Sequence, residues 1–477
     1  MSDTDQLIPE DLDDDEPLRA ELRLCFVGSS GVRQGPPYQL QHEQDLQLGR
    51  EKSCSLWIED SVVSELHASV HPQLTDKGWQ VELRDCESRN GTFVNGVKID
   101  RCLLRSGDVI RVGNSLLHFQ VSRIGDEDYP IPGVIGCSPA IRHLRTQIEV
   151  FAPTTNSILI LGESGVGKEV VAQAIHKLSR RSGKLVATNC ANIEKTLADS
   201  TLFGHKRGAF TGATEDRAGL FQTAHTGTLF LDEVGELAKD VQSKFLRALE
   251  TKAFLPLGRE HEVHSDARCI AATNVALTQA VDEGRFREDL YYRLAGVLLE
   301  VPPLRDRRDD ILLLAQHFLP SPLKLTAQLA EALMLHSWPG NVRELRSLMA
   351  KVCELARAKG VTELRLGLCR DDLKRAAAHG QLPSSSQSAE SMAPASVPPA
   401  SVPPAPVPAP APPAPPGVRS RELKPSKEEL LSALIRCDWK ILRVAKLTQW
   451  DRHSIRRWMT QYGLQRPEQP LTTAPRS

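Results

Sequence analysis

A glycine-rich loop in the middle of the chain has the composition and spacing of a phosphate-binding P-loop. It follows an apolar run at 158–161 and precedes a helical pattern that starts at Glu169. Glycines let successive backbone N–H groups converge on phosphate oxygens, and the N-terminus of the next helix adds positive partial charge. Lys168 would reach the β- and γ-phosphates. The predicted nucleotide-binding residues here are Gly162, Glu163, Ser164, Gly165, Val166, Gly167, Lys168 and Glu169.

Two carboxylates follow a second apolar run. Asp232 and Glu233 come directly after Leu229-Phe230-Leu231. In nucleotide hydrolysis one carboxylate holds Mg²⁺, directly or through water, and another polarises the attacking water. An acidic pair at a strand end is usually only solvated, but its place after a buried run favours catalysis. We therefore predict ATP hydrolysis with Mg²⁺, in which Asp232 binds the metal and nucleotide and Glu233 is the catalytic base.

Short apolar runs must position these side chains. The runs 158–161, 228–231 and 269–272 are continuous rather than alternating, as in strands buried on both faces of a sheet. Helical stretches alternate with them, which predicts a βαβ arrangement and an α/β domain over 132–300. Only helical patterns remain from Leu304 to about Ala378, which predicts an all-helical region after the α/β domain.

The segment between the two nucleotide motifs resembles a known family. Gly208-Ala209-Phe210-Thr211-Gly212-Ala213 is similar to the GAFTGA loop of the bacterial enhancer-binding proteins, the AAA+ activators of sigma-54 RNA polymerase. The resemblance covers 132–378 and implies that these six residues contact sigma-54 and that 301–378 form an α-helical lid. An exposed Phe is unfavourable unless it docks on a partner. The alternative interpretation is a surface loop with Phe210 tucked in. Glu169, where a P-loop prefers Ser or Thr, is also what this family carries.

The same resemblance assigns roles to further residues. Asn189 matches the asparagine that engages the catalytic glutamate, Asn274 matches sensor I, and Arg343 matches sensor II in the lid. Arg287 and Arg293 match the arginines that project into the ATP site of a neighbouring subunit, where arginine stabilises phosphoryl charge. Arginines acting between subunits imply a ring, and by resemblance a homo-oligomeric hexamer.

The N-terminal part of the chain has a β texture. Residues 79–84 and 117–121 alternate between apolar and polar side chains, as half-buried strands do. Asn95-Gly96 stands between strand formers, which is a strong hairpin signal. Closely spaced strands without a helical period predict a β-sandwich over 22–125.

This sandwich resembles the forkhead-associated (FHA) domain, which binds phosphothreonine. The resemblance rests on Arg50 after a glycine, on Ser64-x-x-His67, and on Asn90 in an Asn-Gly-Thr run. It implies that Arg50 pairs with the phosphate, that Ser64 adds a hydroxyl donor, and that Asn90 holds the peptide backbone. Arg89 is a further candidate contact. The implied partner is a phosphothreonine protein, either a Ser/Thr kinase or its substrate.

An alternative interpretation of the sandwich remains open. Glu65 stands where the FHA family often has Arg or Asn, and an inward-pointing carboxylate would weaken phosphate binding. His67, Gly91 and Asn95-Gly96 could be purely structural. The sandwich would then be a protein-docking domain that does not recognise phosphate.

The end of the chain has a basic helical pattern. Residues 419–477 hold 13 basic and 6 acidic side chains. Ser426 is a predicted N-cap before an apolar stripe, and 421–466 resembles the Fis-type helix-turn-helix of sigma-54 activators. The resemblance implies enhancer DNA as a partner. Residues of its second helix that would enter the major groove are Arg452, His453, Arg456 and Arg457.

Composition limits the class of protein. A net charge of −1 excludes a generally basic surface, so any DNA contact is local. No run approaches 18 apolar residues, so no membrane span is expected. The ten cysteines include no Cys-x-x-Cys pair, which favours thiols in a reducing cytoplasm. We expect a disordered acidic tail at 1–21, unlike a targeting peptide. The stretch 379–420 is an expected linker, since 13 of the 32 prolines lie in 381–420.

These observations predict a cytoplasmic, multidomain transcription activator. It would bind enhancer DNA, use ATP hydrolysis to remodel the closed complex of the sigma-54 RNA polymerase holoenzyme, and respond to phosphothreonine through the sandwich. Two alternatives remain: an AAA+ remodelling ATPase that acts on another protein, and a phosphopeptide-dependent, DNA-bound scaffold with an inactive ATPase. The loop at 208–213 and the basic C-terminus favour the first reading.

Overall fold

The computed structural model describes residues 18–76, 78–123, 130–274 and 277–379, together with Lys427 and Tyr462. The residues before 387 form one compact unit, and a second unit begins at 387. Within the described residues, no helix is both long and apolar enough to cross a membrane. The predicted linker lies outside the described residues except for His379, which ends a helix, and the predicted helix-turn-helix lies outside them apart from Lys427 and Tyr462.

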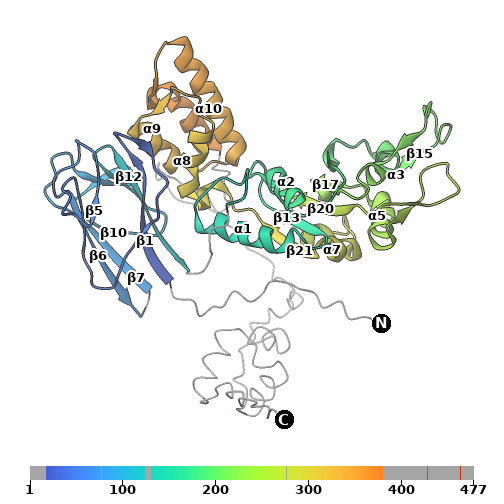
Figure 1. Ribbon diagram of the computed structural model, residues 1–477, viewed down its shortest axis with the longest axis horizontal. Helices are drawn as coiled ribbons and strands as arrows, with labels where there is room; N and C mark the ends of the chain where they lie inside the picture. Colours follow the sequence, from blue (N-terminus) through green and yellow to red (C-terminus); the bar gives the residue numbers. More distant parts are fainter. Residues whose placement is uncertain are drawn as a thin grey trace, which may run out of the picture. The chain divides into compact units, whose positions relative to one another are not determined.

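The N-terminal module is a β-sandwich, as predicted (Figure 1). One sheet has the order β2-β1-β12-β11-β8-β9, with β3 also on β1, and the other has the order β10-β7-β6-β4-β5. Asn95 and Gly96 have φ angles of 50° and 80° and form the turn between β8 and β9, which confirms the predicted hairpin. The first strand begins at Leu18, so the sandwich starts earlier than the expected boundary at 22.

The strands of the sandwich are β1 (Leu18–Val27), β2 (Gly31–Val32), β3 (Tyr38–Gln39), β4 (Leu46–Gly49), β5 (Leu56–Trp57), β6 (Ala68–Thr75), β7 (Gly78–Asp85), β8 (Thr92–Val94), β9 (Val97–Ile99), β10 (Arg101–Leu103), β11 (Val109–Val112) and β12 (Ser115–Arg123).

The second module is a parallel α/β sheet in the order β14-β17-β20-β13-β21. All three predicted apolar runs are strands of it. Ile158, Leu159 and Ile160 are fully buried because helices cover the sheet (Figure 1). The sheet and its main helices are β13 (Ile158–Leu161), β14 (Leu185–Asn189), β17 (Thr228–Asp232), β20 (Arg268–Thr273), β21 (Val297–Glu300), α1 (Pro139–Phe151), α2 (Lys168–Leu178), α5 (Lys239–Thr251), α6 (Leu277–Asp282) and α7 (Glu288–Leu294).

A small subregion projects from this sheet. In Figure 1, β15 and α3 lie at the end of the α/β module away from α1. The aromatic rings of Phe203, Phe221 and Phe254 pack together inside it, with centroids 5.7 to 5.8 Å apart. Its elements are α3 (Ala198–Phe203), β15 (Gly204–His205), β16 (Arg217–Ala218), α4 (Leu220–Thr223), β18 (Ala253–Phe254) and β19 (Val263–His264).

The lid is helical, as predicted, and its core surrounds the fully buried Trp338. The indole N–H donates to the carbonyl of Leu333 at 2.9 Å, so the one polar group of this side chain is satisfied. A short parallel pair, β22 (Lys324–Leu325) with β23 (Glu363–Leu364), was not predicted. The lid helices are α8 (Arg308–His317), α9 (Ala327–Leu335), α10 (Asn341–Ala358) and α11 (Arg370–His379).

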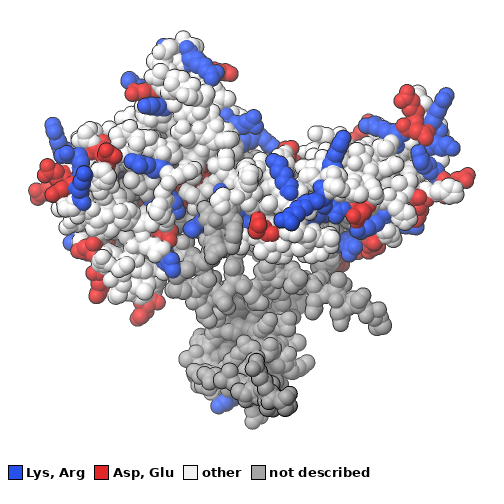
Figure 2. Space-filling model, viewed as in Figure 1, with Lys and Arg blue, Asp and Glu red and all other residues white. Residues whose placement is uncertain are grey.

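Charged side chains of both signs are interspersed on the face of the molecule seen in Figure 2. This distribution agrees with the near-zero net charge of the whole chain.

Candidate functional site

A cavity of about 530 Å³ lies where the P-loop, the end of β17 and the lid helix α10 meet. Parallel strands place their carboxyl ends at one edge of a sheet, and so the loop after β13 and the carboxylates after β17 lie together. Predicted residues that line the cavity are Ser164, Gly165, Val166, Gly167, Lys168, Glu169, Asp232, Glu233 and Arg343.

Lys168 is a buried cation of this cavity. Its Nζ donates to the carbonyls of Gly162 (2.9 Å) and Glu163 (3.3 Å) and lies 3.9 Å from Glu233 Oε1. Burial lowers the pKa of Lys168, and the nearby Glu233 and Asp232 partly oppose that shift. Gly167 caps α2 with φ of 110° and no side-chain cap bond. The first N–H groups of α2 therefore have no side-chain cap to compete with a phosphate, as a P-loop requires.

The two carboxylates point to different partners. Asp232 Oδ2 accepts a hydrogen bond from Asn189 Nδ2 at 3.3 Å, because Asn189 and Asp232 are directly paired at the ends of β14 and β17. Glu233 has a left-handed φ of 51°, and its Oε2 accepts the backbone N–H of Asn274 at 3.2 Å. In this structure Asn189 therefore bonds to Asp232, and its contact with the catalytic glutamate stays a prediction.

The lid holds the P-loop through polar side chains. Arg305 forms a bidentate ion pair with Glu163 at 2.6 and 2.9 Å, and Asn341 Nδ2 donates to the same carboxylate at 3.0 Å. These bonds lower the pKa of Glu163. Arg343 Nη1 donates to the Ser164 hydroxyl at 3.0 Å. The Glu163 side chain thus faces the lid, where its carboxylate is paired with Arg305 and Asn341.

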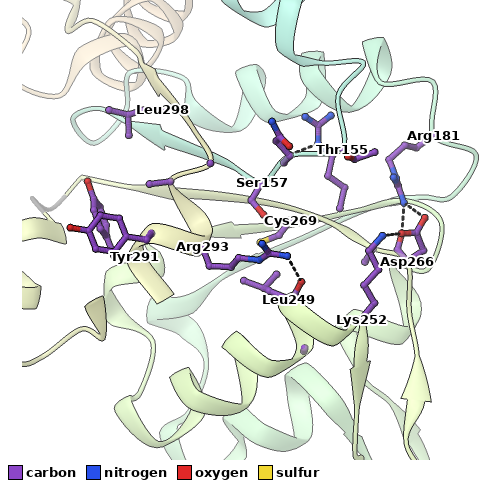
Figure 3. A pocket seen from close by; sticks show the side chains of 17 residues that line it. Thr155, Ser157, Arg181, Leu249, Lys252, Asp266, Cys269, Tyr291, Arg293 and Leu298 are labelled. Atoms are coloured by element: carbon purple, nitrogen blue, oxygen red, sulfur yellow. Dashed lines mark hydrogen bonds and ion pairs between the residues drawn. The ribbon is translucent and has the colours of Figure 1, made fainter. Parts of the chain in front are cut away.

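Arg287 and Arg293 do not line the cavity around Lys168. Arg293 lies in a second cavity of about 560 Å³, next to Cys269 and Tyr291 and donating to the carbonyl of Leu249 (Figure 3). This cavity opens at the amino ends of the strands, opposite the P-loop. Arg287 is exposed and paired with Asp289 at 2.7 Å.

The loop with the GAFTGA pattern projects from the β15–β16 pair. Its base is closed by backbone bonds from Gly208 N to Ala213 O (2.9 Å) and from Ala213 N to Phe210 O (3.0 Å). Thr211 is exposed and Ala213 is buried. Phe210 is half-buried, with its ring edge-on to His205 at 5.0 Å between centroids. The tip therefore presents Thr211 to solvent, while Phe210 leans on the body of the protein.

The predicted phosphate contacts of the sandwich come together on loops at one end of it. Ser64 Oγ accepts the backbone N–H of Arg89 at 3.1 Å, and Asn90 Nδ2 donates to the carbonyl of Val62 at 2.8 Å. The guanidinium of Arg50 is half-exposed. Glu65 is exposed, and its Oε1 lies 3.8 Å from Arg50 Nη2. Arg50 is therefore accessible, with one loose acidic neighbour.

Sequence reasoning missed several residues at the nucleotide cavity. Gly133, Val134 and Ile135 line it just before α1, and so do Arg307 and Arg346 from the lid. Gly133, Arg307 and Arg346 belong to no sequence motif with a fixed spacing, so the sequence alone did not indicate them. The predicted DNA-contacting residues lie outside the described residues; they are Arg452, His453, Arg456 and Arg457.

Comparisons with known proteins agree with this geometry. The family described as "Sigma-54 interaction domain" matches residues 134–300, "FHA domain" matches 46–113 and "AAA+ ATPase lid domain" matches 305–381. These matches coincide with the α/β module, the sandwich and the lid. They do not extend to the C-terminal residues.

Curated relatives share the central part of the chain. The Nif-specific regulatory protein of Herbaspirillum seropedicae is 42% identical over 254 residues, 51% of this chain and 47% of that protein. The transcriptional regulatory protein ZraR of Escherichia coli K12 is 44% identical over 50% of this chain and 56% of its own. The sigma54-dependent transcriptional activator SfnR of Pseudomonas putida is 46% identical over 44% and 60%.

The chain thus spans about half the length of the curated relatives it matches. The matched part contains the cavity with Lys168, Asp232 and Glu233 and the loop with Phe210 and Thr211. An FHA domain stands before it. The chain therefore carries the AAA+ sigma-54 interaction domain and lid that are found in sigma-54-dependent transcriptional regulators, joined to an N-terminal FHA domain.

Proposed function

We propose that this protein is a sigma-54-dependent transcription activator that hydrolyses ATP and is controlled by phosphothreonine recognition. The observation that carries the proposal is the cavity in which Lys168, Asp232 and Glu233 converge within a sigma-54 interaction domain. Its projecting loop presents an exposed Thr211 beside a half-buried Phe210, which suits a surface that engages a partner.

The residues of the cavity divide the hydrolytic chemistry. Lys168 and the first N–H groups of α2 would bind the β- and γ-phosphates of ATP, and Arg343 would reach the nucleotide from the lid. Bound Mg²⁺ would neutralise phosphate charge, and the Asp232 carboxylate would bind it. Glu233, held by the Asn274 N–H, would accept the proton of the attacking water.

The loop would convert nucleotide state into a mechanical change at sigma-54. Asn189 is bonded to Asp232 and stands at the end of β14, directly before the segment that leads to α3 and the loop. A shift of the Asp232 carboxylate on nucleotide binding or hydrolysis would therefore be transmitted through Asn189 and the short segment after β14 to the loop at 208–213. The remodelled partner would be the closed complex of the sigma-54 RNA polymerase holoenzyme.

Assembly and DNA binding complete the proposal. Arg287 and Arg293 stand away from the cavity of their own chain, and we propose that they act at the ATP site of a neighbour in a hexamer. The basic C-terminal residues would hold enhancer DNA. A phosphothreonine protein, a Ser/Thr kinase or its substrate, would bind at Arg50, Ser64, Arg89 and Asn90. These reactions take place in the cytoplasm.

The test is open-complex formation by the full chain at a sigma-54 promoter with purified polymerase. The wild-type protein should hydrolyse ATP and open the promoter, and Lys168→Ala should do neither. Thr211→Ala should retain hydrolysis and lose opening, because Thr211 is exposed and does not line the cavity. Hydrolysis indifferent to sigma-54 and DNA would favour a remodelling ATPase for another protein. No hydrolysis in the wild type would favour the DNA-bound scaffold.

A further inference from the structure

The segment that begins helix α8 contacts both the nucleotide loop and the β-sandwich. On one side, Arg305 pairs with Glu163 of the P-loop, and the buried Arg307 donates from Nη2 to the carbonyl of Val166 at 2.8 Å. On the other side, Arg308 Nη1 donates to the carbonyl of Gly107 in the sandwich at 2.8 Å. A displacement of this segment must therefore change its contacts with the P-loop and its contact with the sandwich at the same time.

A buried charge cluster joins α8 to the sandwich. Asp309 Oδ1 lies 2.6 Å from His118 Nδ1, and Asp309 Oδ2 lies 3.5 Å from Arg23 Nε. None of the three side chains is more than 10% exposed. Burial alone would raise the pKa of Asp309, but His118 and Arg23 lower it below its usual value. Removal of Asp309 would leave the buried Arg23 without its carboxylate and should therefore weaken this contact between the two modules.

Apolar packing extends this contact. Phe26, Val109 and Leu116 of the sandwich belong to the same buried core as Leu329 and Met334 of α9. At the edge of the core, Arg111 Nε donates to Glu331 Oε2 on α9 at 2.9 Å. The sandwich is therefore docked on the lid by a continuous core with an ion pair at its rim.

The first turn of α8 also holds residues 136–138, which precede α1. The buried Asp310 carboxylate accepts the backbone N–H groups of Cys137 (2.6 Å) and Ser138 (2.8 Å) and the Ser138 hydroxyl (2.7 Å). A Cβ atom at Gly136 would lie 2.7 Å from this carboxylate, so the approach requires glycine. The residues just before, 133–135, line the nucleotide cavity.

We propose that docking of the β-sandwich on the lid sets the nucleotide affinity of the ATPase, with residues 305–310 as the shared element. The proposal rests on nucleotide binding at the P-loop. Docking of the sandwich fixes the positions of α8 and of Arg305 and Arg307, which contact the P-loop. It also fixes residues 133–135, which line the nucleotide cavity. A contact that stabilises the binding arrangement raises affinity, and bound nucleotide strengthens docking by the same factor. A ligand that loosens the docked sandwich would lower the affinity for nucleotide.

The test measures ADP binding to the full chain by calorimetry. Glu331→Arg places two cations at the rim of the interface, and the dissociation constant should rise about fivefold or more, at the low end of known couplings. The double variant Arg111→Glu/Glu331→Arg restores opposite charges and should restore affinity. Glu354→Arg, the same change at an exposed position of α10, is the matched control and should bind like the wild type.

A second readout checks docking itself. ADP should slow amide hydrogen exchange in β12 and α8 of the wild type, and should slow it less in Glu331→Arg. Equal ADP affinities in wild type and Glu331→Arg, or tighter binding by the variant, would overturn the coupling. If the wild type bound ADP but Glu331→Arg bound it equally well, only the coupling would fail; if the wild type bound no ADP, the proposed ATPase function would fail as well. Lys168→Ala, which should lose ADP binding without touching the interface, checks that the measured binding is at the P-loop.

Discussion

The ring of Phe210 stands edge-on against the ring of His205, with centroids 5.0 Å apart and planes inclined at 67°. Ser200 Oγ lies 2.7 Å from His205 Nδ1 and fixes the imidazole. An edge-to-face pair of this kind contributes about 1 kcal/mol beyond burial. The contact between Phe210 and His205 is therefore weak, and a small shift of the loop is enough to break it.

Loss of the imidazole should loosen the loop without affecting hydrolysis. In His205→Ala the Phe210 ring has no edge partner, so amide exchange over residues 204–218 should become faster. ATP turnover by the protein alone should be unchanged, because His205 does not line the nucleotide cavity. His205→Phe, which keeps a ring, should retain most of the protection. Unchanged exchange in His205→Ala would show that the contact does not hold the loop.

Glu233→Gln should separate binding from hydrolysis. The amide retains the volume of the side chain but cannot accept the proton of water, and general-base catalysis is worth about 10²–10⁴ in rate. ATP turnover should fall by that factor while ADP affinity stays near that of the wild type. A variant that hydrolyses ATP normally would require another base.

The arginines far from the cavity should act only in assemblies. Arg293→Ala should lower turnover by about 10³ or more, as for other arginines that act on phosphoryl charge between subunits. Nucleotide affinity of dilute protein should not change, since Arg293 lies outside the cavity of its own chain. Arg247→Ala, which removes an exposed arginine paired with Glu262, is the control. A turnover per chain that does not depend on protein concentration would argue against action between subunits.

Glu65 should weaken phosphothreonine binding only slightly. Its carboxylate lies 3.8 Å from Arg50, and both side chains are exposed. Exposed ion pairs contribute about 0–1 kcal/mol, so Glu65→Gln should tighten phosphopeptide binding by no more than about fivefold. Arg50→Ala should abolish it. The measurement is binding of the full chain to peptides in threonine and phosphothreonine forms, and equal binding of both forms would make the sandwich a docking domain.

Stability should fall in mild acid. Burial lowers the pKa of His67 and of His336 in the folded protein, with smaller opposing effects from their neighbours. Because the folded pKa lies below the unfolded value of about 6.5, their contribution is complete above that pH and is lost as the pH falls below it. His67 Nδ1 accepts the Ser64 N–H at 3.1 Å, a bond that protonation removes. Melting temperatures between about pH 7.5 and 5.5 should therefore decrease, and less steeply in His67→Gln.

Local chemistry explains what could be predicted from sequence. The continuous run at 158–161 is a strand buried on both faces, and Asn95-Gly96 forms its turn because both residues tolerate positive φ. Lys168, Asp232 and Glu233 meet because parallel strands align their carboxyl ends. These features depend on residue type and short spacing.

Contacts between distant segments could not be predicted in the same way. The partner of Asn189 depends on strand register and on the left-handed φ of Glu233, neither of which has a sequence signal. From the sequence alone, residues 305–310 indicate only the start of a helix rich in charged residues. Its role in joining three modules arises from the fold, because each of its side chains finds a different neighbour.

The core shared by the sandwich and the lid affects how the chain can be divided. A fragment that starts after residue 129 would lack Phe26 and Leu116 and would expose the apolar side chains of α9 that they cover. Apolar patches of this kind cause self-association. Aggregates of such a fragment, held together through the bare lid, would be mistaken for rings, so subunit stoichiometry should be determined on protein that retains its N-terminal sandwich.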